Sequence, residues 1–273
     1  MKNEWSNIKS NQYVKRNKNL GFSRDMALRV YTTRLLGRNK ELVLHGGGNT
    51  SVKTSTRDVD GKNYKVLCVK GSGWDMADIE PAGLPAVKLE PLLGLKRKKY
   101  LSDEDMVSLQ KRNLINIRSP NPSVETFLHA FLPFKFVDHT HADAVLNLTN
   151  RMGGLSFCKK VFGNKVSIVP YVMPGFMLAK KINEFYSKNP NINCLILMNH
   201  GIFTFADDCK QAYDLMIKYV SQAEKAIKKL KVKKIKQIKN YTTKFNANEI
   251  APIIRGLLSN NKDQKFVVNY RLN

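Results

Sequence analysis

Apolar residues recur at helical spacing in some parts of the chain and form short strand-like runs in others. Five segments have helical spacing: residues 23–35 with Ser23 as N-cap, a segment capped by Ser102, and residues 123–132, 176–186 and 209 onward. Six runs are typical of strands: residues 42–44, 52–55, 64–69, 135–141, 166–172 and 194–198. Short strands and helices mixed with hairpins predict an α/β sandwich whose sheet is not purely parallel. The same order argues against a doubly wound nucleotide-binding domain.

The composition limits the class of protein. The 273 residues are 42% hydrophobic and 9% aromatic, which suits one large globular domain or two small ones. No apolar run approaches the roughly 18 residues of a membrane span, and residues 1–19 are polar and lysine-rich, unlike a signal peptide. The four cysteines are scattered without a C-x-x-C motif. These features predict a cytoplasmic, membrane-free protein without disulfides.

The formal charge of +24 raises the question of a nucleic-acid partner. The lysines are spread over the whole length and no nucleic-acid module is present, so we do not expect nucleic-acid binding. The densest basic segment, residues 225–239, is predicted to be a helix with one thin apolar stripe. Whether that segment docks a partner domain or faces solvent is left open.

Three of the five histidines form a pattern that predicts a metal site. His139 and His141 lie at the end of a predicted strand, where side chains two residues apart point to the same side. His200 follows another apolar strand, at a turn marked by Gly201. Three imidazoles with one open position are typical of a catalytic zinc-type site. The alternative for the pair alone is two strand-end histidines without a metal, and the third histidine favours the metal.

Glu125 is the candidate acid–base residue. It lies in the opening turn of the helix predicted from Ser123. A carboxylate near a metal can be a ligand, a proton shuttle or both; alternatively, Glu125 only stabilises the first helical turn through the helix dipole. The residues alone leave both interpretations open. His129, four residues later, is predicted to pack against or orient Glu125 rather than to bind a metal.

Two glycine-rich segments suit an anion. Residues 46–51 (GGGNTS) and 70–73 (KGSG) both follow predicted strands. Glycine lets backbone N–H groups approach a phosphate, and Asn and Ser side chains add donors. Each loop alone is also consistent with an ordinary turn, and neither matches a P-loop or dinucleotide motif. Beside a histidine triad they predict a phosphorylated small molecule, held by N–H donors at one end and by the metal at the other.

These motifs together resemble the class II aldolase/adducin family. The segments that carry the resemblance, in family order over roughly residues 25 to 225, are residues 47–51, 70–73, 122–125, 139–142 and 199–201. The chain is similar in particular to the N-terminal half of bifunctional rhamnulose-1-phosphate aldolase/short-chain dehydrogenases. The longer runs that carry this similarity are residues 42–54, 136–144, 168–176 and 200–205.

The resemblance implies a three-layer α/β/α sandwich around a mostly antiparallel sheet, commonly assembled as a fourfold tetramer with active sites at subunit interfaces. It implies Zn²⁺, or another divalent metal, bound by the three histidines, with Glu125 as acid–base group. It implies substrate and phosphate binding by a set of small polar residues: Asn49, Ser51, Ser72, Gly73 and Ser123. The implied reaction is reversible cleavage of a ketose 1-phosphate, here L-rhamnulose 1-phosphate, to dihydroxyacetone phosphate and L-lactaldehyde.

The chain departs from the family pattern in two ways. Val124 stands where the simpler aldolases usually have a phosphate-binding serine. The bifunctional relatives continue into a nicotinamide-dependent dehydrogenase, and this chain ends at Asn273 before any dinucleotide motif. We therefore expect a catalytic domain over residues 1–240, a segment resembling an interdomain linker over residues 241–273, and no NAD binding by this polypeptide. The dehydrogenase is then either a separate polypeptide or missing from a shortened form.

Two other functions share these features. A sugar-phosphate epimerase or dehydratase would use the same metal and fold, and the triad does not separate them from an aldolase. A non-catalytic adducin-like module would keep the fold, but we expect such a module to lose its metal ligands. Because all three histidines and Glu125 are present, the sequence favours an enzyme, a metal-dependent aldehyde-lyase.

Overall fold

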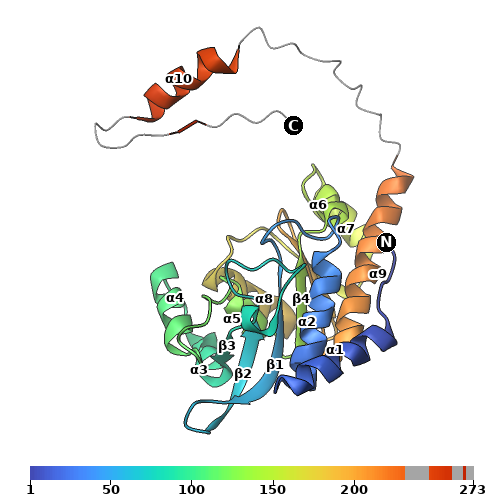
Figure 1. The fold of residues 1–273 in the computed structure, drawn as a ribbon. Coiled ribbons are helices and arrows are strands. Elements are labelled where there is room, and N and C mark those ends of the chain that lie inside the picture. The colour runs from blue at the N-terminus through green and yellow to red at the C-terminus, as the bar shows by residue number, and fades with distance from the viewer. Residues whose placement is uncertain (231–245, 260–266, 269–273) are drawn as a thin grey trace. The chain divides into compact units, whose positions relative to one another are not determined.

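The computed structural model describes residues 1–230, 246–259 and 267–268 (Figure 1). The chain divides into two compact units, Met1–Leu230 and Lys231–Asn273, and each is described by itself. In the second unit the described structure is one helix, α10 (Ala247–Leu258). Everything that follows on the sheet, the layers and the site concerns the first unit.

The first unit is built on a seven-stranded sheet with the order β3-β2-β1-β4-β7-β6-β5. Neighbouring strands pair antiparallel, except β5 and β6, which are parallel. The strands are β1 (Asn49–Arg57), β2 (Asn63–Val69), β3 (Ala86–Lys88), β4 (Phe136–Thr140), β5 (Val166–Val169), β6 (Cys194–Leu197) and β7 (Gly201–Ala206). This confirms the prediction of a mostly antiparallel sheet.

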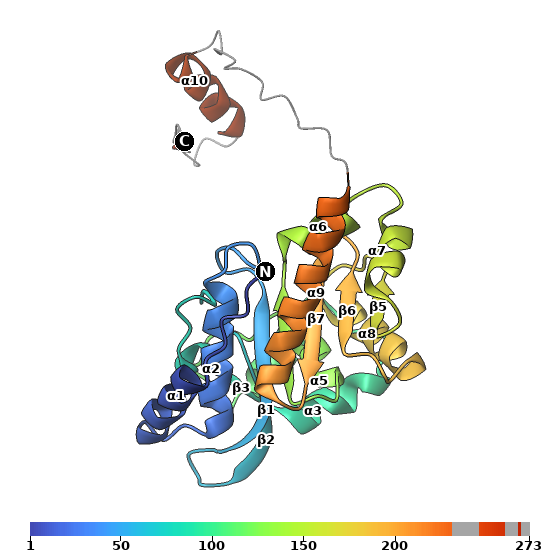
Figure 2. The same cartoon turned by 90° about the vertical axis from the view of Figure 1, so that its right-hand side faces the viewer.

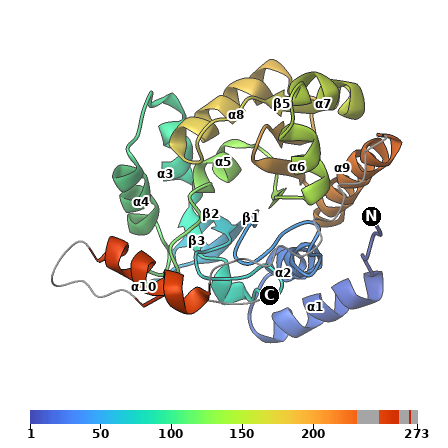
Figure 3. The ribbon, with the colours of Figure 1, turned by 90° about the horizontal axis from the view of Figure 1, so that it is seen from above.

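Helices cover both faces of the sheet, which makes a three-layer α/β/α sandwich (Figures 2 and 3). The helices α3, α5 and α8 cover one face; α2 and α9 cover the other, where α6 and α7 pack against α9. The bounds of the helices in this unit are α1 (Asn7–Asn19), α2 (Arg24–Gly37), α3 (Leu89–Gly94), α4 (Asp103–Arg112), α5 (Thr126–Phe131), α6 (Asp143–Thr149), α7 (Gly154–Phe162), α8 (Phe176–Lys188) and α9 (Cys209–Lys229).

Strand β4 divides its side chains between the two faces. Phe136 packs into the apolar cluster on the α2 side, and Val137 packs into the cluster that contains the α5 side chains. Because side chains two residues apart share a face, Asp138 is on the α2 side, where it meets Arg29, and His139 is on the α5 side. The pleat of one buried strand therefore separates a structural ion pair from the candidate metal ligand.

Most predicted elements are confirmed. Ser23 and Ser102 accept hydrogen bonds from N–H groups in the first turns of α2 and α4, as N-caps do. The β1–β2 hairpin closes through residues 58–62, and α8 and α9 begin where the apolar pattern predicts. Within the described residues no helix is both long and apolar enough to cross a lipid bilayer.

Some local predictions were wrong. Residues 42–44 form turns and loop rather than a strand: the N–H groups of Leu42 and Val43 both donate to the Asn39 carbonyl, which follows the end of α2. The helix expected over residues 123–132 is confined to α5, because Glu125 is its N-cap and not part of its first turn. Helix α1 and the short α3, α6 and α7 were not predicted. The helix expected over residues 225–239 is seen as far as Lys229, and the part after residue 230 lies outside the described residues.

Candidate active site

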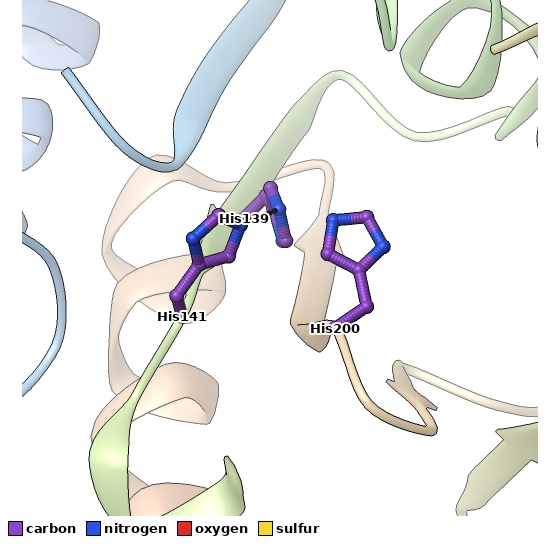
Figure 4. A group of neighbouring side chains, drawn as sticks. All are labelled: His139, His141 and His200. Carbon is purple, nitrogen blue, oxygen red and sulfur yellow. Dashed lines mark hydrogen bonds between the residues drawn. The ribbon is translucent and has the colours of Figure 1, made fainter. Parts of the chain in front are cut away.

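His139 and His141 come together at the end of β4. The His139 ring is fully buried and stacks on Phe203 of the neighbouring strand β7, with ring centroids 3.9 Å apart. Its Nδ1 lies 3.1 Å from the Ile202 carbonyl oxygen, which can only accept, so Nδ1 carries the proton and Nε2 presents a lone pair. That Nε2 lies 3.0 Å from the Nε2 of His141. Figure 4 shows both rings beside the third histidine.

His200 enters the site from the turn of the β6–β7 hairpin (Figure 4). Asn199 before it has a left-handed backbone with φ 58°. Gly201 after it lies so close to β4 that an added Cβ would be 2.4 Å from the Thr140 carbonyl oxygen. Only glycine therefore lets the hairpin approach β4 closely enough to bring His200 to the pair. One ring nitrogen from each histidine lies within 4.8 Å of the others.

Glu125 completes the cluster from the start of α5. Its carboxylate is almost fully buried: Oε2 lies 3.4 Å from His139 Nε2, and Oε1 lies 3.4 Å from His200 Nε2. Asn49 Nδ2 donates to Oε2 at 2.7 Å, while Oε1 has no hydrogen-bond donor within the described chain. Burial raises the pKa of Glu125 to about 7, and the Asn49 hydrogen bond opposes that rise.

The protonation of the histidines suits a cation. Burial lowers the pKa of His139 well below its ordinary value and the pKa of His200 to about 4; the neighbouring imidazoles add to both effects. Burial also lowers the pKa of His141. All three rings are therefore neutral near pH 7, the form in which an imidazole can bind a cation. Tetrahedral zinc with Zn–N bonds of 2.0–2.1 Å separates its ligand atoms by roughly 3.3 Å. The Nε2 atoms of His139 and His141 are 3.0 Å apart, whereas the ligand atoms of the whole triad lie within 4.8 Å of one another.

The residues thus fit a divalent metal. Three neutral imidazole nitrogens lie together, and beside them Glu125 Oε1 is a buried carboxylate oxygen that no donor in the described chain satisfies. Nitrogen and oxygen ligands of this kind bind zinc and also manganese, cobalt or iron.

A pocket of about 400 Å³ opens over this cluster. His141, His200 and Glu125 line its floor, and the two glycine-rich loops line its wall. Lys70 also lines it: the side chain is 5% exposed, and its Nζ donates to the Gly46 carbonyl at 3.0 Å. Burial lowers the pKa of Lys70. The sequence reasoning did not assign Lys70 to the site, although a lysine directly after an apolar strand and just before a glycine loop was a usable signal.

The glycine loops use most of their backbone donors internally. Five N–H groups already have acceptors in the chain, those of Gly46, Gly47, Gly71, Ser72 and Ser123. The N–H of Gly73 has no acceptor within the described residues. The N–H groups of Gly48 and Val124, which also line the pocket, likewise have no acceptor within the described residues. The groups left for an anion are therefore these three N–H groups, the hydroxyls of Ser72 and Ser123, and the Lys70 ammonium.

The structure brings together seven of the nine predicted site residues around the pocket. The lining includes His141, His200, Glu125, Asn49, Ser72, Gly73 and Ser123. His139 lies directly beneath, within reach of His141 and Glu125. Ser51 is placed elsewhere: it is fully buried in β1 and its hydroxyl contacts His129 instead of the pocket.

Solved structures of other proteins share the fold of this chain. One solved structure is the N-terminal class II aldolase domain of a conserved protein from Thermoplasma acidophilum. It is 42% identical to this chain in sequence, with a TM-score of 0.73, and the match covers 83% of this chain and 99% of that one. A sugar-phosphate aldolase from Thermotoga maritima has the same fold, with 17% identity and a TM-score of 0.55 over 74% of this chain and 93% of that one.

A longer relative comes from Bacillus subtilis (strain 168), where it is named uncharacterized oxidoreductase YuxG. It is 34% identical over 248 residues, which cover 88% of this chain and 36% of the relative. The chain thus spans about a third of the length of this relative. The model of the class II aldolase and adducin N-terminal domain matches residues 27–227, which contain the histidine triad, Glu125 and both glycine loops. On that match, this chain belongs to the class II aldolase and adducin N-terminal domain family.

Proposed function

We propose that this chain is a metal-dependent aldolase that reversibly cleaves a ketose 1-phosphate to dihydroxyacetone phosphate and an aldehyde. The substrate we propose is L-rhamnulose 1-phosphate, which gives L-lactaldehyde. The observation that carries the proposal is the convergence of His139, His141, His200 and Glu125 under a pocket whose wall offers donors to an anion. The retained ligand set favours a catalytic domain over an adducin-like module.

The histidines would hold the cation, which we propose is Zn²⁺. When bound, it supplies Lewis-acid polarisation of the substrate carbonyl and stabilises the negative charge that develops as the C3–C4 bond breaks. The protein keeps the imidazoles neutral by burial and fixes the His139 ring through the Ile202 carbonyl. The triad is therefore ordered by the fold itself.

Glu125 would exchange a proton with the substrate at C3. In cleavage, the C4 hydroxyl proton passes to the Glu125 carboxylate, the C3–C4 bond breaks to release the aldehyde, and Glu125 returns that proton to C3. The Oε1 oxygen faces the site without a donor in the described chain, so it is the atom that can hold that proton. Burial raises the pKa of Glu125 and so favours the protonated form that this step requires, whereas a bound cation would act in the opposite direction.

The phosphate would lie against Lys70, Ser72, Gly73 and Ser123. The ammonium, the two hydroxyls and the Gly73 N–H are donors that line the pocket and are not used up within the described chain. Val124 offers no hydroxyl, and its side chain is 52% exposed beside the pocket. Lys70 would supply the charge that compensates for the missing serine hydroxyl.

The assembly and partners are part of the same proposal. By resemblance we propose a homotetramer, with residues 241–273 serving as the connection to a dehydrogenase that is carried on another polypeptide or on a longer form of this one. The chain spans 36% of its Bacillus subtilis relative, which is named as an oxidoreductase. The described part of this segment is α10, whose Ile253 and Leu257 are exposed.

The test is release of dihydroxyacetone phosphate from L-rhamnulose 1-phosphate by the purified full chain. Activity that a chelator abolishes and Zn²⁺ restores would support the aldolase. Isomerised or dehydrated sugar phosphate instead of dihydroxyacetone phosphate would replace it with the epimerase or dehydratase. A folded, metal-loaded protein that converts none of several ketose 1-phosphates would contradict the proposal.

Lys70→Met tests the phosphate site separately. A hydrogen bond to a charged group contributes about 1.5–3 kcal/mol, so we expect kcat/KM for the phosphorylated sugar to fall roughly 10–100-fold. The unphosphorylated ketose should lose far less, so the preference for the phosphorylated substrate should shrink. The control is Lys40→Met, because Lys40 is exposed and outside the pocket lining. An unchanged preference in Lys70→Met would remove Lys70 from the phosphate site.

A further inference from the structure

The Glu125 carboxylate depends on one side-chain donor. Asn49 Nδ2 donates to Glu125 Oε2 at 2.7 Å and to Ser123 Oγ at 3.0 Å. No other side-chain donor to Glu125 is found within the described chain apart from the histidines of the triad. The orientation of one amide group on β1 therefore decides how the candidate acid–base group is held.

An asparagine amide is nearly symmetric in shape, so its orientation must be imposed by a neighbour. If the Asn49 amide turned over, Oδ1 would face the Glu125 carboxylate and the two oxygens would repel. On the other side, Asn49 Oδ1 lies 2.5 Å from Nε2 of His129. Since Oδ1 can only accept, the His129 Nε2 must carry a proton, and this N–H fixes the amide with Nδ2 toward Glu125.

The state of His129 is fixed in turn. Its ring is fully buried, so the neutral form is favoured, and Nε2 holds its one proton. The other nitrogen, Nδ1, lies 2.8 Å from Ser51 Oγ and accepts the hydroxyl proton. Phe203 packs edge-on against the ring with centroids 5.6 Å apart. The donors therefore run in one direction, from Ser51 to His129, from His129 to Asn49, and from Asn49 to Glu125.

We infer that His129 is a positioning residue for Glu125, acting through Asn49, and that Ser51 fixes its tautomer. This gives Ser51 a role in the buried chain of hydrogen bonds, away from the substrate. It also explains why a histidine occupies a fully buried position four residues after Glu125 without reaching the triad. The inference about turnover rests on the proposed function; the inference about the tautomer does not.

The kinetic test compares His129→Leu, His129→Gln and Phe127→Leu in the metal-loaded full chain. Leucine removes both hydrogen bonds, whereas glutamine offers one N–H donor and one acceptor. We expect His129→Leu to lower kcat by roughly 10–100-fold, the usual cost of losing a group that orients an active-site residue, with KM changed less than about threefold. His129→Gln should recover most of kcat. Phe127→Leu, a core change on the same helix, should leave kcat near that of the unaltered chain.

A double-mutant cycle separates positioning from simple packing. If His129 acts through Asn49, adding His129→Leu to Asn49→Ala should lower kcat no further, whereas Phe127→Leu should act independently of Asn49→Ala. Additive losses for His129 and Asn49, or equal losses for Phe127→Leu, would overturn the inference. Bound metal should stay constant across the set.

A readout without turnover keeps the inference testable if the aldolase proposal fails. Nitrogen-15 NMR of the imidazoles should show His129 as the neutral tautomer with the proton on Nε2. The Nδ1 resonance of His129 should shift in Ser51→Ala and stay unchanged in Ser72→Ala. A proton on Nδ1, or a charged ring near pH 7, would contradict the direction of the hydrogen bonds. An inactive protein with the expected tautomer would reject the proposed reaction and keep the positioning chain.

Discussion

If the triad binds the proposed metal, each of its imidazoles should be needed, because each offers one ligand atom. We expect His139→Ala and His200→Ala to lose bound metal and activity together, by more than about tenfold in affinity. The matched control is His45→Asn, since His45 is exposed, outside the pocket lining, and in a left-handed conformation that asparagine tolerates.

Metal content by elemental analysis, measured beside turnover in each variant, decides this prediction. Full activity in a His139→Ala protein that contains no metal would remove the triad from the active site. Loss of metal in His45→Asn would instead indicate that the substitutions disturb the fold.

Glu125 differs from the histidines in what its loss should cost. Glu125→Gln keeps the size of the side chain and removes its capacity to hold a proton. We expect the metal to stay largely bound while turnover falls by about 10²–10⁴, the usual contribution of a general acid–base group. Metal content and kcat measured on the same preparation test this. Near-normal turnover would exclude Glu125 from proton transfer, whereas parallel loss of metal would make it chiefly a ligand.

At the scale of elements, α2 and β4 are joined by a buried ion pair. Arg29 and Asp138 are both fully buried, with Nη2 and Oδ1 2.5 Å apart, and Arg29 Nη1 also donates to the Ser51 carbonyl. Removing one partner leaves an unpaired buried charge, which costs about 3–5 kcal/mol. We therefore expect Arg29→Met or Asp138→Leu to lower the free energy of unfolding by that amount.

Replacing both partners should cost less than the sum of the single changes, because no charge is then left unpaired. Urea unfolding of the two single variants and the double variant measures this coupling. Strictly additive losses would show that the two side chains stabilise the protein independently. The double variant also tests whether β4 still presents His139, since Asp138 and His139 are adjacent on that strand.

The elements that the sequence predicted are those whose signals are local. Ser23 and Ser102 predict the starts of α2 and α4, because an N-cap side chain accepts a hydrogen bond from an N–H group within three residues. The run at residues 42–44 is apolar enough for a strand, yet Leu42 and Val43 are buried in a loop, since tertiary contacts bury them without a strand partner. Periodicity alone does not distinguish these two outcomes.

In the candidate site, too, the features that depend on local geometry were predicted and those that depend on long-range contacts were not. The H-x-H spacing of His139 and His141 predicted their shared direction, because it depends only on strand geometry. The direction of Ser51 into the interior, toward His129, depends on pairing between β1 and β4 and on the placement of α5. Those are long-range contacts, which residue spacing within one motif does not contain. The hydrogen bond from Lys70 Nζ to the Gly46 carbonyl also depends on contacts between segments far apart in the sequence.

At the scale of the whole molecule, part of the large positive charge is used inside the fold. Lys53 Nζ donates to the carbonyl oxygens of His129 and Phe134 at 2.8 and 2.7 Å, and Lys96 Nζ donates to that of Phe131 at 2.9 Å. These carbonyls lie in or just after α5, where cations complement the helix dipole. Some of the lysines therefore act as hydrogen-bond donors to the helix that presents Glu125 and His129, a role that needs no nucleic-acid partner.

The burial of Lys53 should make the stability of the protein depend on pH. Burial lowers the pKa of Lys53 to about 7, with the charge of Lys96 acting in the same direction, whereas a lysine in an unfolded chain titrates near 10.4. Between these two values the unfolded state binds more protons, so the Lys53 contribution to the free energy of unfolding rises with pH. The rise is at most ~1.4 kcal/mol for each pH unit, and less because the side chain keeps some contact with solvent.

Lys53→Met should therefore reduce the increase of the free energy of unfolding between about pH 7 and pH 10. Urea unfolding at each pH measures this quantity, and the result is expressed as the difference from the unaltered chain. The difference isolates Lys53 because cysteines and tyrosines that titrate in the same range are common to both proteins. Lys65→Met on the adjoining strand is the matched control, since Lys65 is exposed and should leave the pH dependence unchanged. If the free energy of unfolding changes equally with pH in Lys53→Met and the unaltered chain, the Lys53 ammonium stays charged over this range. Its hydrogen bonds to the carbonyls of His129 and Phe134 would then offset the cost of burial.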